Sequence, residues 1–176
     1  DNTLHDATYS SYLGINEGMT GYIVEQLGFS PAEAGALRHR YWLRYGATLL
    51  GLVRHHGVRP AHFLEHAHRL PGLEERVYGH RHDLHALRRL ARRPGRCCVL
   101  TNAPADYTAR VLRALGIDSL FDAVLSIEDM RMFGQWRPKP DARMLVRMAV
   151  RMRADPRHCV LVEDTLEHQK AARRIG

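Results

Sequence analysis

The sequence has few of the features that mark secreted or membrane proteins. No apolar run approaches the roughly 20 residues that a membrane-spanning helix needs. Only three of the 176 residues are cysteine, Cys97, Cys98 and Cys159, and no Cys-x-x-Cys pair occurs. Neither a disulfide framework nor a zinc ribbon is therefore expected. Because all three cysteines lie in apolar runs, we expect reduced thiols in buried strands of a cytoplasmic protein with no membrane partner.

Lysine is also scarce. Of the 26 lysines and arginines only Lys139 and Lys170 are lysine, and with 19 acidic residues the formal net charge is +7. Such a charge attracts polyanions. The arginines are, however, scattered along the expected helices, mostly without interleaved aromatic residues, a pattern that does not favour binding of a nucleic-acid polymer. A basic surface would still attract small phosphorylated molecules.

The first part of the chain carries helical signals only. Ser30-Pro31-Ala32-Glu33 is a capping box with proline at the first helical position. Gly28, Gly46 and Gly57 stand where helices are expected to end. Together with the helical spacing of the apolar residues, these signals predict helices over residues 9–27, 31–44, 47–56 and 60–70.

From about residue 80 the signals alternate between helix and strand. Helices are expected over residues 82–93, 104–115, 141–153 and 166–175, and strands over 97–101, 121–126 and 158–163. Strands that alternate with helices predict an α/β fold with a parallel sheet and right-handed crossovers.

The last expected strand ends in two carboxylates. Cys159 to Val162 form an unbroken apolar run, and Glu163 and Asp164 follow it. Open α/β sheets bind ligands at the carboxyl ends of their strands, and adjacent acids there are costly without a cation between them. Mg²⁺ prefers oxygen ligands and often bridges to phosphate. The alternative is a solvated strand end with two helix-capping acids.

Three other stretches favour the first interpretation, in which the two carboxylates bind Mg²⁺ beside a phosphate. Thr101 and Asn102 follow the apolar run of another expected strand, Lys139 stands between two prolines, and Asp1-Asn2-Thr3-Leu4 opens the chain. Together with Glu163-Asp164, these stretches resemble the four motifs of the haloacid dehalogenase superfamily of phosphohydrolases. Residues 1–3 resemble the tail of the first motif, Asp-x-Asp-x-Thr, while Thr101, Lys139 and Glu163-Asp164 resemble the second, third and fourth.

The resemblance implies a Rossmann-like parallel-sheet core, with helices on both faces and an inserted all-helical cap. Residues 1–6 and 80–176 would form the core, and residues 7–79 the cap that closes over the substrate. The superfamily's first motif follows a central strand and begins with an aspartate two residues before the one that Asp1 matches. We therefore expect this chain to be a fragment of a longer polypeptide, with its first and last strands missing.

The resemblance also implies a mechanism with an aspartyl-phosphate intermediate. The nucleophile would be the aspartate upstream of Asp1, so the chain as given is expected to lack turnover. Asp1 would be the general acid and base, Thr101 and Asn102 would contact the phosphate, and Lys139 would neutralise its charge. Mg²⁺ would be bound mainly by Asp164 and by Asp1 through its main-chain carbonyl, while Glu163 would bind it through water or adjust it from behind the direct ligands.

Within the superfamily the resemblance is strongest to the pyrimidine 5′-nucleotidase branch. It rests on residues in the expected cap and on Leu100 to Ala103, Ile127 to Asp129 and Val162 to Thr165. The resemblance implies hydrolysis of nucleoside 5′-monophosphates, with Tyr45 and Thr48 contacting base or sugar. Packing within the cap is the alternative for both. A sugar-phosphate or phosphoglycolate phosphatase and a non-catalytic relative that binds a phosphorylated ligand remain open, and the sequence does not give the oligomeric state.

The histidines suggest a second metal site only weakly. His62, Glu65 and His66 spell His-x-x-Glu-His, a zinc-protease pattern. One such short match carries little weight in a chain with 12 histidines, and it lies away from the expected strand ends.

Overall fold

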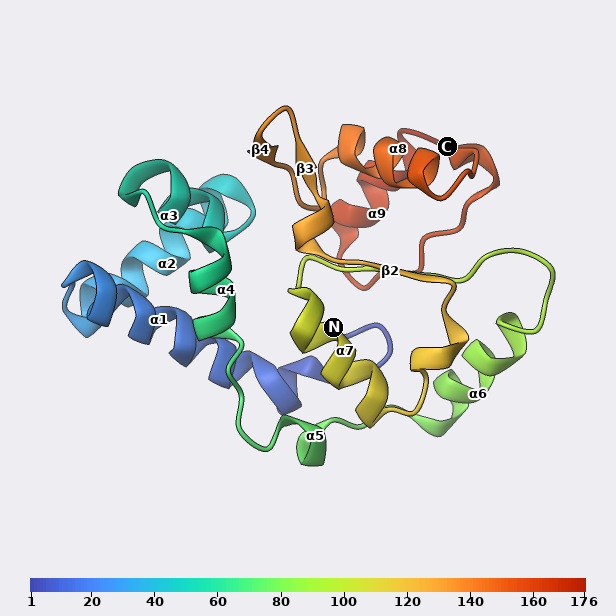
Figure 1. Cartoon of the computed structure of the whole chain (residues 1–176), viewed down its shortest axis with the longest axis horizontal. Helices are drawn as coiled ribbons and strands as arrows, with labels where there is room; N and C mark the ends of the chain where they lie inside the picture. Colours follow the sequence, from blue (N-terminus) through green and yellow to red (C-terminus); the bar gives the residue numbers. More distant parts are fainter. The chain divides into compact units, whose positions relative to one another are not determined.

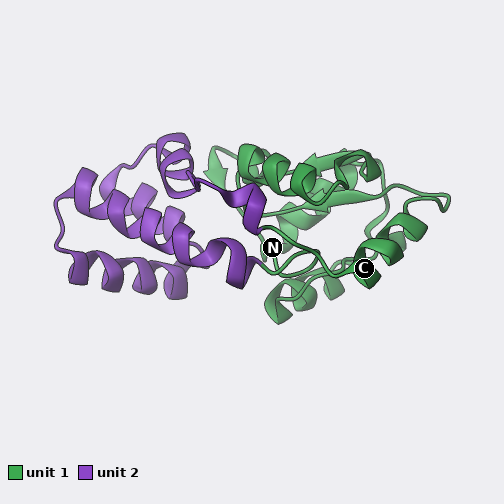
Figure 2. Ribbon diagram, turned by 90° about the horizontal axis from the view of Figure 1, so that it is seen from below, with its two compact units in different colours: residues 1–6, 77–176 green, residues 7–76 purple.

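The computed structural model describes residues 1–176, which form two compact units (Figure 2). Unit 1 consists of Asp1–Asp6 and Val77–Gly176, and unit 2 of Ala7–Arg76. Unit 1 contains all the strands, and unit 2 is helical. No helix in either unit is both long enough and apolar enough to cross a membrane.

Unit 2 is a stack of short helices. A π-helical turn, Thr8–Tyr12, leads into α1 (Leu13–Leu27), followed by α2 (Pro31–Tyr45), α3 (Thr48–His56), α4 (Pro60–Ala67) and the single turn α5 (Leu73–Arg76). The predicted capping box is present, because Ser30 and Glu33 bond each other's backbone amides. The helices α1, α2 and α3 each end at a left-handed glycine, Gly28, Gly46 and Gly57. These local signals explain why the helix bounds agree closely with the sequence prediction.

Two glycines bring the helices of unit 2 close together. A Cβ at Gly51 in α3 would clash with the Tyr41 ring of α2, and one at Gly18 in α1 would lie 2.9 Å from the carbonyl oxygen of Ala67 at the end of α4. α1 therefore packs against α2 and α4, and α2 packs against α3. Large apolar residues such as Ile23, Leu52 and Phe63 fill the space between these helices.

Unit 1 is built on a small parallel sheet (Figure 1). β1 (Cys98–Leu100) pairs in parallel with β2 (Ala123–Leu125), with Val99 opposite Val124. The amide of Thr101 donates to the carbonyl oxygen of Leu125 at 2.9 Å, which extends the pairing by one bond. α7 (Ala105–Ala114) crosses over between these two strands.

The remaining α-helices of unit 1 are α6 (Arg81–Leu90), α8 (Ala142–Arg151) and α9 (Leu166–Arg173), and three 3₁₀ turns lie at Asp118–Leu120, Ile127–Asp129 and Pro156–His158. α8 is capped by the Asp141 side chain, which accepts from the amide of Met144 at 3.0 Å. Its buried face packs Met144 and Met148 against Leu125 and Met130, and this cluster anchors α8 beside the sheet.

A short hairpin precedes Lys139, where the sequence predicted only a loop. β3 (Arg131–Met132) pairs antiparallel with β4 (Gln135–Trp136). The turn residues Phe133 and Gly134 have φ values of 52° and 77°, so both are left-handed, as in the tight turns that join two strands. Phe-Gly is not the usual sequence for such a turn, which explains why the hairpin was missed.

The prediction of a buried strand over residues 158–163 is wrong. The segment forms no β-ladder, and Val160 and Val162 are 90% and 70% exposed. An apolar run becomes a strand only beside a hydrogen-bonding neighbour, and no segment of residues 1–176 pairs with this one. The prediction of buried cysteines also fails, because Cys159 is exposed and Cys97 and Cys98 are only half-buried.

Candidate active site

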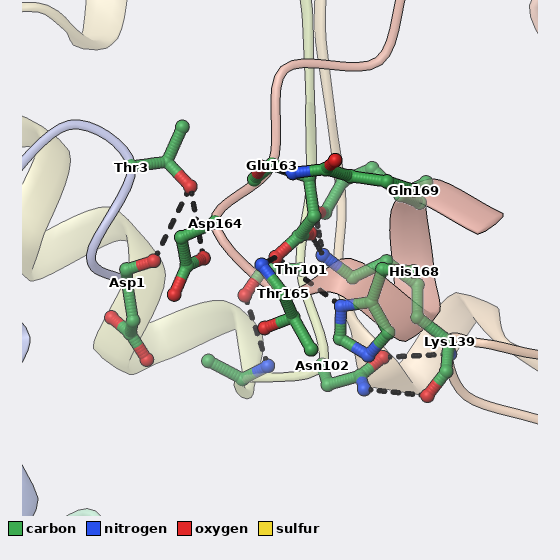
Figure 3. A network of polar contacts seen from close by, with 12 residues as sticks. Asp1, Thr3, Thr101, Asn102, Lys139, Glu163, Asp164, Thr165, His168 and Gln169 are labelled. Carbon is green, nitrogen blue, oxygen red and sulfur yellow. Dashed lines mark hydrogen bonds and ion pairs between the residues drawn. The ribbon is translucent and has the colours of Figure 1, made fainter. Parts of the chain in front are cut away.

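Lys139 lies at the centre of a polar network at the carboxyl end of β1 (Figure 3). Its side chain is 9% exposed, and its ammonium group donates to the carbonyl oxygen of Leu100 at 2.9 Å and to Glu163 Oε2 at 2.6 Å. A buried ammonium is tolerated only when it is paired in this way. The pairing fixes a positive charge beside the end of the strand.

Glu163 is held from several directions. Its Oε1 lies 3.2 Å from His168 Nδ1 and accepts from the amide of Thr165, also at 3.2 Å. Burial alone would raise the pKa of this carboxyl, but the contacts with His168 and Lys139 outweigh it and hold the pKa well below its usual range. Glu163 is therefore an anion that faces Lys139.

Asn102, in the turn after β1, forms hydrogen bonds with the loop that carries Lys139, here called the lysine loop. Its Nδ2 donates to the carbonyl oxygen of Lys139 at 3.0 Å, and its Oδ1 accepts from the amide of Lys139 at 2.9 Å. The adjacent Thr101 accepts from the amide of Ala103 at 3.1 Å through its hydroxyl oxygen. The Thr101 hydroxyl hydrogen remains available to a ligand.

Asp1 and Asp164 meet at Thr3. The Thr3 hydroxyl lies 3.4 Å from the main-chain oxygen of Asp1 and 3.4 Å from Asp164 Oδ1, as Figure 3 shows. The structure thus brings together the predicted residues from both ends of the sequence, 163 positions apart.

Two residues that the sequence did not single out contact the Asp1 side chain. His5 Nε2 lies 2.9 Å from Asp1 Oδ1, and the Tyr107 hydroxyl donates to the same oxygen at 3.0 Å. Burial lowers the pKa of His5 to about 4, so the ring is neutral at pH 7 and Nε2 carries the hydrogen that it donates. No local pattern could have identified Tyr107, since its contact spans 106 positions.

The donor set suits Mg²⁺ in part. The main-chain oxygen of Asp1 and the carboxylate of Asp164, which both lie beside the Thr3 hydroxyl, are hard oxygen donors. Mg²⁺ usually takes one or two carboxylates together with phosphate and water. Glu163 fits less well as a direct ligand, because both of its oxygens have other partners. No three His, Cys, Asp or Glu side chains of residues 1–176 gather into a complete metal site.

The other predicted residues, Tyr45 and Thr48, belong to unit 2. The Tyr45 hydroxyl is 2.6 Å from His55 Nε2, while Thr48 is buried and donates to the carbonyl oxygen of Arg38 at 3.2 Å. Both hydroxyls are therefore engaged within unit 2.

The histidines of the zinc-like pattern also have partners other than a metal. His62 Nδ1 is 3.1 Å from the Tyr22 hydroxyl, and His66 Nε2 lies 3.8 Å from Glu25 Oε2. Both contacts join α4 to α1.

Comparison with known proteins indicates a family. The sequence model of a haloacid dehalogenase-like hydrolase family, described as a hydrolase, matches residues 32–176. The chain belongs to that family. Its α/β core with a small parallel sheet fits the fold of that family.

Two solved structures share the fold of this haloacid dehalogenase-like hydrolase. A HAD phosphatase from Thermococcus onnurineus is 17% identical and superposes with a TM-score of 0.65, covering 100% of this chain and 80% of its own. A HAD-superfamily hydrolase of subfamily IA, variant 1, from Geobacter sulfurreducens PCA is 20% identical, with a TM-score of 0.55 and coverage of 99% and 80%. At these identities the likeness concerns the fold alone.

Proposed function

We propose that this hydrolase is a Mg²⁺-dependent phosphomonoesterase that acts on nucleoside 5′-monophosphates. The observation that carries the proposal is the environment of Lys139. Its buried ammonium is fixed between Leu100 and Glu163, next to the free hydroxyl hydrogen of Thr101. A fixed cation beside a hydroxyl donor suits the charge on a transferring phosphoryl group.

In the first step a carboxylate upstream of Asp1 bonds to phosphorus while the bond from phosphorus to the ester oxygen breaks. Asp1 gives its proton to the departing alkoxide, and the nucleoside leaves as an alcohol. In the second step water bonds to phosphorus and loses a proton to Asp1. The acyl–phosphate bond breaks, which releases inorganic phosphate and restores the carboxylate.

The residues of this chain have separate tasks in both steps. Thr101 donates to a phosphoryl oxygen, and Lys139 neutralises the charge shared by nucleophile and phosphate. Asp164 and the main-chain oxygen of Asp1 would bind Mg²⁺, with Glu163 as the partner of Lys139. When bound, Mg²⁺ supplies the positive charge that lets two anions approach each other.

The nucleophile is proposed to follow a strand that precedes Asp1 in a longer polypeptide. The support is the segment from Cys159 to Val162, which is apolar yet lacks a strand neighbour and exposes Val160 and Val162. A strand beside this segment would cover both valines. Without the upstream aspartate, residues 1–176 are expected to lack turnover.

The proposed preference for nucleotides rests on the motif resemblance and on the Tyr45 ring. The guanidinium groups of Arg44 and Arg54 lie 5.5 and 6.0 Å from its centroid. An aromatic ring flanked by cations suits the stacking and charge of a nucleotide. We propose that unit 2 acts as the cap and offers this surface to the base.

The test is phosphate release from a panel of nucleoside and sugar monophosphates with Mg²⁺. Two polypeptides are compared, residues 1–176 and the same chain with its upstream sequence. Turnover only in the longer polypeptide, fastest with nucleotides, is the expected result. Faster turnover of sugar phosphates would identify these, and not nucleotides, as the substrate class. If both polypeptides are folded and neither releases phosphate, the result would favour a non-catalytic phosphate-binding protein.

A further inference from the structure

Two buried donors converge on a single oxygen of Asp1. His5 Nε2 and the Tyr107 hydroxyl lie 2.9 and 3.0 Å from Oδ1. Both residues are closed to solvent, with exposed fractions of 5% for His5 and 2% for Tyr107. Both donors are at Oδ1 and not at the other carboxylate oxygen, Oδ2. The two oxygens of Asp1 are therefore chemically distinct.

The position of Tyr107 is fixed by the start of α7. The amide of Ala105 donates to both carboxylate oxygens of Glu128, at 3.1 and 3.2 Å, and the hydroxyl of Thr108 donates to the carbonyl oxygen of Pro104 at 2.8 Å. The same turn follows directly from Thr101 and Asn102. One hydrogen-bonded segment thus carries both the Thr101 hydroxyl and the donor to Asp1.

An oxygen that already accepts two hydrogen bonds is the poorer site for a proton. We propose that Tyr107 and His5 are positioning residues, which occupy Oδ1 of Asp1 so that Oδ2 carries the proton delivered to the leaving group. The inference rests on the proposed function, because it assumes that Asp1 is the general acid. It goes further by assigning the proton to one oxygen and its orientation to two named residues.

The inference predicts an effect that depends on the leaving group. A nucleoside leaves as an alkoxide and needs a proton, whereas para-nitrophenolate leaves readily without one. A misplaced Asp1 therefore slows hydrolysis of the nucleotide and spares para-nitrophenyl phosphate. A general loss of structure would slow both.

The experiment uses the polypeptide with its upstream sequence and measures kcat/KM for a nucleoside monophosphate and for para-nitrophenyl phosphate. This ratio reports the steps up to transfer to the aspartate and not the later hydrolysis. Tyr107→Phe keeps the buried ring and removes only the hydroxyl. We expect it to lower kcat/KM for the nucleotide about tenfold, which is near the upper end of what one neutral hydrogen bond contributes. We expect kcat/KM for the aryl ester to stay unchanged.

Tyr78→Phe is the matched control, because it removes a hydroxyl that donates to a different carboxylate, Asp6 Oδ2, at 3.2 Å. We expect it to leave kcat/KM unchanged for both substrates. For His5, replacement by leucine should give the same selective loss as Tyr107→Phe, and His5→Gln, which keeps an N–H donor, should restore part of it.

An equal loss on both esters, or no loss on either, would overturn the positioning role while leaving the phosphatase intact. If the unaltered polypeptide hydrolyses neither ester, the proposed function itself fails, and the positioning inference fails with it.

Discussion

Asn102 and Lys139 exchange two hydrogen bonds, of 3.0 and 2.9 Å, between the side-chain amide of one and the backbone of the other. Both ends of the amide are thereby used. That Asn102 contacts the substrate stays a prediction, and in the structure its amide side chain fixes the loop that carries Lys139. The turn after β1 and the lysine loop form one assembly.

Breaking this exchange is expected to destabilise unit 1. Asn102→Asp keeps an acceptor for the amide of Lys139 but places a second acceptor against its carbonyl oxygen. We expect the free energy of unfolding to fall by about 1–3 kcal/mol, the cost of a buried group left without its partner. Urea denaturation measures this change.

Asn16→Ala is a suitable control for the loss of an amide, because Asn16 lies in unit 2 and accepts from Arg38 at 2.7 Å. It should leave the stability of unit 1 unchanged. An Asn102→Asp protein as stable as the parent would show that the exchange does not hold the loop.

The Lys139–Glu163 ion pair is expected to matter more than the surface pairs. Both side chains are less than 10% exposed, so Lys139→Met leaves a buried carboxylate without its cation. Losing one partner of such a pair costs about 3–5 kcal/mol. Urea denaturation of Lys139→Met, Glu163→Gln and the double variant gives the coupling free energy, which should be large and favourable. Additive losses would contradict a direct interaction.

The effect of Mg²⁺ on thermal stability should differ between variants of Asp164 and variants of Glu163. In the polypeptide with its upstream sequence, Mg²⁺ is expected to raise Tm, because a ligand that binds only the folded state stabilises it. Asp164→Asn should remove this rise. Glu163→Gln should lower Tm with and without Mg²⁺ but keep a rise on adding the metal. Loss of the rise in Glu163→Gln alone would identify Glu163 as the metal ligand.

Stability should fall in acid partly through Asp141. Burial acts to raise the pKa of this carboxyl, but hydrogen bonds from Arg137 and from the amide of Met144 outweigh it and lower the pKa below its usual value. A lowered pKa in the folded state stabilises the protein above the unfolded pKa of about 4, and this stability is lost as the pH falls through the folded pKa.

Asp141→Asn should therefore lower the free energy of unfolding at pH 7 and reduce its dependence on pH below about pH 4. Denaturation with urea at a series of pH values tests both effects. Asp118→Asn, which removes an exposed carboxylate of unit 1 that caps no helix through its side chain, controls for the change in net charge. An unchanged pH dependence in Asp141→Asn would refute the assignment.

The helices were predictable because their signals are local. Ser30, Glu33 and the terminal glycines act within a few residues of their own position, and the structure places the helix ends beside them. The run from Cys159 to Val162 shows the limit of such reasoning. Its composition favours a strand, but a strand also requires a neighbour, which sequence composition alone does not reveal.

The candidate site was predictable in its residues but not in its contacts. Motif positions indicated Asp1, Lys139 and Asp164, whereas the pairing of Lys139 with Glu163 and of Asp1 with Tyr107 joins residues 24 and 106 positions apart. Such contacts depend on the packing of whole elements. The buried His5 was missed because a single histidine in a loop carries no periodic signal.

The central claim is that the site around Lys139 hydrolyses phosphomonoesters. The most direct measurement compares Lys139→Met with Lys170→Met, which removes the exposed second lysine of the chain, in the polypeptide with its upstream sequence. With a nucleoside monophosphate and Mg²⁺, Lys139→Met should lower kcat by about a hundredfold or more, as expected for a group that stabilises transition-state charge, and Lys170→Met should leave it unchanged. Equal turnover by the two folded variants would contradict the account.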